Sequence, residues 1–72
     1  MGKLRVLSGS EICQILEEHD FRFARQRGSH RIMQRLIEGS TVTVPVPLYD
    51  PVRRGTLLSI IRQSGLPKHL FE

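Results

Sequence analysis

The first apolar pattern along the chain predicts an amphipathic helix that begins near residue 8. Ser8-Gly9-Ser10-Glu11 has the form of a capping box, in which the serine hydroxyl accepts a hydrogen bond from a free backbone N–H and the glutamate reaches back. Ile12, Ile15 and Leu16 then recur at helical spacing, and His19 lies near the expected end. We expect a helix of about three turns with one apolar stripe.

The next segment predicts a β-hairpin. Residues 21–27 begin with aromatic and polar residues in alternation, which is typical of a half-buried strand, so we expect Phe21 and Phe23 to face the core. Gly28-Ser29 can form a tight turn, and residues 30–35 can return as a second strand. The pattern of this second strand does not determine which of its two faces points toward the core.

A third strand follows a second turn. Residues 37–40 contain a glycine and form the turn, and residues 41–44 are a β-branched run that predicts a strand. We expect Pro45 and Pro47 to stop this strand, because proline cannot donate to a sheet ladder. Three strands in a meander are the simplest arrangement.

The C-terminal part of the chain predicts a second amphipathic helix. Leucine and isoleucine recur at helical spacing within residues 55–66. Gly65 suits the left-handed position that closes a helix, Leu66 can fold back onto the last turn, and Pro67 prevents continuation. Residues 68–71 can add one further helical turn.

The order helix, three strands, helix predicts an α+β domain that spans residues 1–72. Both amphipathic helices must cover the same face of the three-stranded antiparallel sheet, because there is no other apolar layer to receive them. This α-β-β-β-α arrangement resembles the double-stranded RNA-binding fold. A likeness of fold does not by itself assign a function.

Charge narrows the classes of partner. The 72 residues carry a formal net charge of +4, with an isoelectric point near 10.2, and acidic residues crowd the first helix. Five arginines fall in the strand segment that follows, at positions Arg22, Arg25, Arg27, Arg31 and Arg35. This distribution favours an anionic partner such as nucleic acid, although an arginine-rich stretch can also be a solvated face.

Other classes of protein are disfavoured. Cys13 is the only cysteine, so an internal disulfide is excluded, and we expect it to be a core or boundary residue of the first helix rather than a nucleophile. No apolar run is long enough for a membrane span, and the N-terminus has no secretory signal pattern. We therefore expect a cytoplasmic protein without membrane contact. No residues suggest a metal site or a cofactor.

Three stretches of the chain together resemble the HicA toxin (YcfA-like) family. They are Ser8-Gly9 with the first helix, Arg25-Gln26-Arg27-Gly28-Ser29-His30 at the first hairpin, and Thr43-Val44-Pro45 followed by residues 55–66. The resemblance covers nearly the whole chain. It implies a type II toxin–antitoxin system in which the toxin cleaves mRNA and a HicB-type antitoxin protein blocks it. It also implies that the active histidine of the family is His30.

The chemistry of RNA cleavage supports His30 independently. Cleavage without a metal needs a group that takes a proton from the 2′-hydroxyl or gives one to the leaving oxygen, and imidazole titrates near neutrality. Without the family pattern, His30 would be interpreted as a polar residue at a hairpin end. Relatives often carry a second histidine shortly after the Val-Pro of the third strand, where this chain has Pro47. A single catalytic histidine is therefore predicted.

The residues around His30 are candidates for contacting RNA. They are Arg25, Arg27, Gly28, Ser29 and Arg31. Because strand neighbours alternate faces, they cannot all meet one RNA. Gly28 has a sufficient structural role in the turn, and Ser29 can orient a phosphate or simply complete the turn. Tyr49 can stack on a base, pack on the protein or contact the antitoxin.

The sequence is compatible with three functions. The first is a metal-independent endoribonuclease toxin, monomeric when free, whose partners are mRNA and a HicB-type antitoxin. The second is an RNA-binding module that uses the same arginines but does not cleave. The third is a protein-interaction domain whose basic face meets an acidic partner, which overlaps with the first because an antitoxin must cover the active face.

Overall fold

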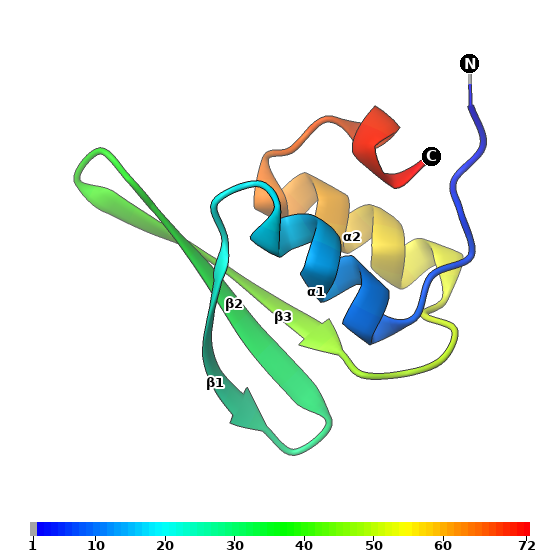
Figure 1. The fold of residues 1–72 in the computed structure, drawn as a ribbon, viewed down its shortest axis with the longest axis horizontal. Helices are drawn as coiled ribbons and strands as arrows, with labels where there is room; N and C mark the ends of the chain where they lie inside the picture. Colours follow the sequence, from blue (N-terminus) through cyan, green and yellow to red (C-terminus); the bar gives the residue numbers. More distant parts are fainter. Residues whose placement is uncertain (1) are drawn as a thin grey trace.

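The order of elements matches the prediction from the sequence. The computed structural model describes residues 2–72. Its elements are α1 (Gly9–Glu17), β1 (Arg22–Arg27), β2 (His30–Ile37), β3 (Ser40–Pro47), α2 (Arg54–Ser64) and a short 3-10 helix, η1 (Lys68–Phe71). Figure 1 shows this chain path.

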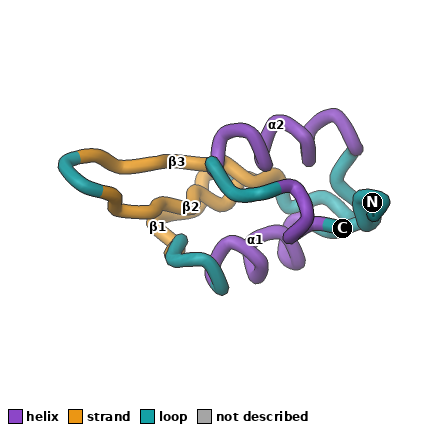
Figure 2. Tube along the Cα trace, turned by 90° about the horizontal axis from the view of Figure 1, so that it is seen from above, coloured by secondary structure: helices purple, strands orange, loops and turns teal. Residues whose placement is uncertain are grey.

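The three strands form an antiparallel meander in the order β1-β2-β3. Both helices lie on the same side of this sheet (Figure 1), and from above they are seen next to each other, with α2 nearer β3 and α1 nearer β1 (Figure 2). The α+β class and the topology shared with the double-stranded RNA-binding fold are thus confirmed. Within residues 2–72 no helix lies on the other face of the sheet, which we call the open face.

Helix α1 begins with the predicted capping box. The backbone N–H of Glu11 donates to the hydroxyl of Ser8 (3.1 Å), and the backbone N–H of Ser8 donates to the carboxylate of Glu11 (2.8 Å). The next N–H, of Gly9, donates to the carbonyl of Tyr49 (2.8 Å). The start of α1 is therefore attached to the chain that follows β3.

Helix α2 ends as the sequence predicts. Gly65 has a φ of 73° and forms the left-handed cap. The hydroxyl of Ser64 donates to the carbonyl of Ile61 (2.7 Å) and accepts from the N–H of Leu66 (3.1 Å), which turns Leu66 back against the core. The predicted final turn is η1, whose Phe71 is fully buried.

The core lies between the helices and one face of the sheet. Helix α1 contributes Ile12, Cys13, Ile15 and Leu16, the sheet contributes Met33, Val44 and Val46, and α2 contributes Leu57, Ile60 and Ile61. Cys13 is 1% exposed, so its predicted place in the core is confirmed.

The two phenylalanines expected in the core differ. Phe21 is buried, but it precedes β1 and its N–H donates to the carbonyl of Leu16 at the end of α1 (3.1 Å). Phe23 pairs with Met33 and so lies on the face that carries the core, as expected, but it is 50% exposed and is not part of the core. Phe23 lies on the edge strand β1, where the register shifts in a bulge between Phe23 and Arg25. An edge strand has no neighbour on its outer side to cover such a side chain.

The third strand is longer than expected. Pro45 and Pro47 were predicted to stop it, but β3 includes both, paired with Ile32 and His30 of β2. Strand β3 is the other edge of the sheet, and an edge strand tolerates proline where the missing N–H would point away from the sheet. This extension brings Pro47 opposite His30.

Gly9 makes a close approach that its lack of a side chain permits. A Cβ atom at this position would lie 2.7 Å from the Cα of Leu48 and closer still to the carbonyl oxygen of Pro47. Both contacts are with backbone atoms, which cannot rotate away as a side chain can. The start of α1 is therefore packed directly on the end of β3.

We predict that Gly9→Ala lowers the free energy of unfolding by about 1–3 kcal/mol, the usual cost of forcing extra volume into a packed contact. Urea denaturation measures this change. Gly55→Ala is the matched control, since a Cβ there meets nothing within 4 Å, and it should leave stability unchanged or raise it by up to about 1 kcal/mol. Equal effects of the two variants would show that the contact at Gly9 is not tight.

Candidate active site

His30 is the first residue of β2 and its side chain is exposed. In the sheet it is paired with Arg27 of β1 on one side and Pro47 of β3 on the other. Residues directly opposite each other in antiparallel strands have side chains on the same face. Arg27, His30 and Pro47 therefore form one row across the sheet.

This row belongs to the sheet face that carries no helix. Met33, Val44 and Val46 point into the core, so their strand neighbours at the alternate positions point away from it. Two further rows share the open face with His30. These rows are Arg25, Ile32 and Pro45, and then Arg22, Gln34 and Thr43.

The open face is basic along β1 and hollowed farther from His30. Three arginines of β1, at positions 22, 25 and 27, lie in successive rows and are exposed. In the third row the amide of Gln34 donates to the hydroxyl of Thr43 (3.4 Å). Arg22, Gln34, Leu36 and Thr41 line a hollow of about 180 Å³. The face thus combines cationic side chains with neutral polar ones, as an anion-binding surface requires.

The turn before His30 is fixed by backbone contacts. Gly28-Ser29 forms the predicted two-residue turn, and Gly28 has a φ of 58°, a conformation that side-chain-bearing residues rarely adopt. The amide of Gln26 donates to the carbonyl of Gly28 (3.2 Å). The carbonyl of Ser29 accepts from the N–H of Leu48 (2.7 Å), which ties the turn to the segment after β3.

Tyr49 is the aromatic neighbour of His30. The two ring centroids are 6.4 Å apart and the ring planes meet at 71°, an edge-to-face arrangement. The sequence left three roles open for Tyr49, and its closeness to His30 was not predicted. No local signal could have revealed it, because the contact depends on β3 pairing with β2 over its full length.

Arg31 is separated from the other candidate residues. It pairs with Val46, whose side chain is in the core, so Arg31 is on the helix-bearing side of the sheet. Its guanidinium lies 5.8 Å from the centroid of the Phe23 ring, in the range of a cation–π contact. Arg25, Arg27, Gly28 and Ser29 are thus on or next to the His30 row, and Arg31 is not.

The remaining histidines are placed elsewhere. Nδ1 of His19 lies 2.9 Å from the carbonyl oxygen of Ile15, so this ring completes the end of α1. His69 is exposed on η1. Within residues 2–72 there is no group of three or more His, Cys, Asp or Glu side chains that could hold a metal ion. No helix in that part of the chain is long and apolar enough to cross a bilayer.

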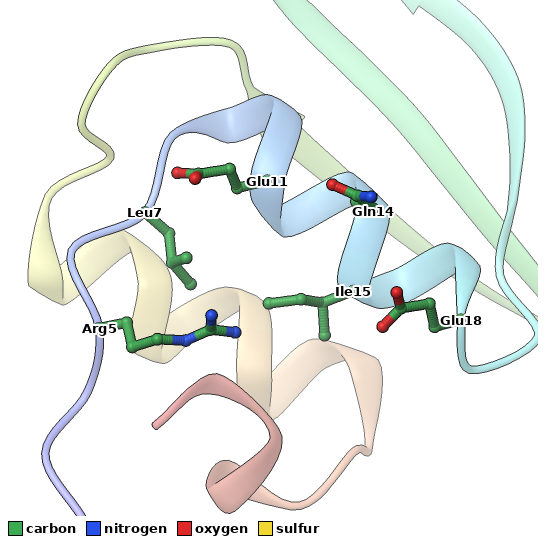
Figure 3. A pocket seen from close by; sticks show the side chains of 6 residues that line it. All are labelled: Arg5, Leu7, Glu11, Gln14, Ile15 and Glu18. Carbon is green, nitrogen blue, oxygen red and sulfur yellow. The ribbon is translucent and has the colours of Figure 1, made fainter.

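A larger hollow, of about 250 Å³, lies between α1 and the N-terminal segment (Figure 3). Arg5 and Leu7 line one side, and the other side is lined by three residues of α1 and its C-cap: Glu11, Gln14, Ile15 and Glu18. Glu11 is already engaged in the capping box. None of the residues predicted to meet RNA lines this hollow, so the row containing His30 is the better candidate site.

Fold and site together define a small basic α+β protein with a histidine beside arginines on an open sheet face. The sequence model of a family described as the HicA toxin of bacterial toxin-antitoxin systems matches residues 9–66, more than half of the chain. The chain belongs to the HicA toxin family, which confirms the resemblance noted in the sequence. No curated protein and no solved structure matched in the corresponding searches.

The position of Arg31 can be tested through Cys13. Burial raises the pKa of the Cys13 thiol, and the charge of Arg31 opposes this by stabilising the thiolate. We predict that Arg31→Gln raises the pKa of Cys13 further, as followed by the ¹³Cβ chemical shift of Cys13 against pH. Arg27→Gln, on the other face, should leave that titration unchanged. A shift in the Arg27 variant alone would contradict the assignment of the two faces.

Proposed function

We propose that this chain is a metal-independent endoribonuclease of a type II toxin–antitoxin system, which cleaves mRNA and is blocked by a HicB-type antitoxin. The observation that carries the proposal is the row formed by His30 and Arg27 on the open face, in a chain of the HicA toxin family. An exposed imidazole beside a guanidinium offers a proton acceptor and a phosphate ligand at one place.

The proposed reaction uses the 2′-hydroxyl of the RNA as the nucleophile. The imidazole of His30 accepts the proton of this hydroxyl while its oxygen attacks the adjacent phosphorus, and the bond to the 5′-oxygen breaks. The proton returns to the 5′-oxygen, leaving a 2′,3′-cyclic phosphate and a 5′-hydroxyl. Arg27 stabilises the negative charge that develops on the phosphate oxygens.

With a single histidine at the site, we expect the rate of RNA cleavage to be low. In relatives a second histidine often follows the Val-Pro of the third strand, and here Pro47 of that region is paired with His30. Proline has no proton to exchange. One general acid–base group contributes roughly 10²–10⁴-fold, so we expect a slow enzyme whose effect in cells depends on release from the antitoxin.

The open face supplies the substrate contacts in this proposal. Arg25 and Arg27 bind backbone phosphates, and the turn at Gly28 and Ser29 lies close enough to orient the phosphate that reacts. Arg31 is left out, because its guanidinium is on the other face of the sheet. The antitoxin would cover the same arginines. The alternative function, an RNA-binding module, shares every feature except proton transfer by His30.

We predict that His30→Ala lowers the rate of RNA cleavage in the presence of EDTA by roughly 10²–10⁴-fold, because it removes the only proposed proton acceptor. The assay uses purified, folded protein free of antitoxin and resolves the cleaved ends. His69→Ala is the matched control, since His69 is exposed on η1, and it should cleave as the wild type does. Equal cleavage by wild type and His30→Ala would remove His30 from the mechanism, and binding without cleavage would favour the RNA-binding module.

A second prediction concerns Arg25 and Arg27. Each phosphate neutralised on single-stranded RNA adds about 0.7 to the slope of log affinity against log salt concentration, so replacing both arginines with glutamine should lower that slope by about 1.4. Fluorescence anisotropy with a 2′-O-methyl RNA, which cannot be cleaved, measures it. Arg62→Gln on α2 is the control and should keep the slope. A slope that falls only in the control would place the RNA on the helical side.

A further inference from the structure

Tyr49 lies beside the candidate catalytic residue and has a large free surface. It is 54% exposed while its ring meets His30 edge to face. Of the four aromatic residues of phenylalanine and tyrosine type, Phe21 and Phe71 are buried. Phe23 is exposed, but it shares the helix-bearing side of the sheet with Arg31. Tyr49 is therefore the one exposed aromatic ring next to His30.

The backbone of Tyr49 is held from two sides. Its carbonyl accepts from the N–H of Gly9 at the start of α1 (2.8 Å), and the preceding residue, Leu48, donates to the carbonyl of Ser29 in the hairpin turn (2.7 Å). The close approach of Gly9 to Pro47 and Leu48 adds a packing contact. These contacts hold the backbone that carries the ring before any ligand arrives, and a preformed binding surface lowers the entropic cost of binding.

We propose that Tyr49 forms a base-stacking subsite that takes the unpaired base next to the phosphate at His30, and that the substrate class is therefore single-stranded RNA. This inference rests on the proposed function. Unpaired bases stack on exposed aromatic side chains, whereas bases inside an A-form duplex are already stacked on each other. A base on Tyr49 fixes the neighbouring ribose, whose 2′-hydroxyl must approach the imidazole.

The subsite has a consequence for selectivity. Every base has a π face, so stacking on one tyrosine selects single strands over duplexes without selecting strongly among sequences. The arginines of β1 supply the attraction for phosphate and Tyr49 supplies the preference for an unpaired nucleotide. The two contributions come from different elements and can be removed separately.

The test uses the fact that Tyr49 is the only tyrosine, so isotope-labelled tyrosine reports this one ring. We expect a 2′-O-methyl oligoadenylate to move the ring protons of Tyr49 upfield and a duplex RNA of equal length to leave them in place. Tyr49→Phe should keep the affinity for the single strand. Tyr49→Leu should lose roughly 5- to 150-fold in affinity, the range that one stacked base contributes, while Phe23→Leu should lose little.

Several results would overturn the subsite. One is an equal upfield shift with duplex RNA, and another is an unchanged affinity of Tyr49→Leu for the single strand. A third is a shift of the Tyr49 ring protons with a HicB-type antitoxin but not with RNA, because that result would identify a protein contact. The 2′-O-methyl probe cannot be cleaved, so these measurements do not depend on catalysis. If the wild-type protein did not cleave RNA while Tyr49 still stacked on the single strand, the proposed nuclease function would fail and the subsite would stand.

Discussion

The structure depends on one backbone junction, where the start of α1, the first hairpin turn and the end of β3 meet. Gly9 lies against the backbone of Pro47 and Leu48, and its N–H donates to the carbonyl of Tyr49. Leu48 in turn donates to the carbonyl of Ser29. These backbone contacts hold the end of β3 beside His30. A fold of this size has a small core. Residues outside the core, such as His30 and Tyr49, are therefore positioned by backbone contacts at the edge of the sheet.

Patterns that involve residues close together in the sequence predicted most of the fold correctly. Features that depend on how distant strands pair could not be predicted. The capping box at Ser8 and the glycine cap at Gly65 involve residues within a few positions of each other, and both were found as predicted. The end of the third strand was predicted wrongly and the large exposure of Phe23 was not predicted, because each depends on which strands are at the edges of the sheet. Tyr49 could not be assigned to the site for the same reason.

The candidate site could be predicted by residue type but not by face. Arg27 and Arg31 both lie within three residues of His30 in the sequence, yet strand pairing places them on opposite faces of the sheet. Arg31 packs over Phe23 and its charge stabilises the thiolate of Cys13, so it interacts with groups on the helix-bearing side of the sheet. Cross-strand register divides one arginine-rich segment between the open face and the helix-bearing face of the sheet, and charge counts along the chain do not contain that division.

The separation of core and site also bears on inhibition. The core side chains are on the helix-bearing face, whereas His30, Arg25 and Arg27 are exposed on the other. Under the proposed function, an antitoxin that covers the open face would block RNA without unfolding the toxin. Because the same arginines would meet phosphates of RNA or acidic side chains of an antitoxin, salt should weaken both complexes. Leu36, 77% exposed at the far end of the open face, adds an apolar side chain there that a protein partner could cover and that salt would not weaken.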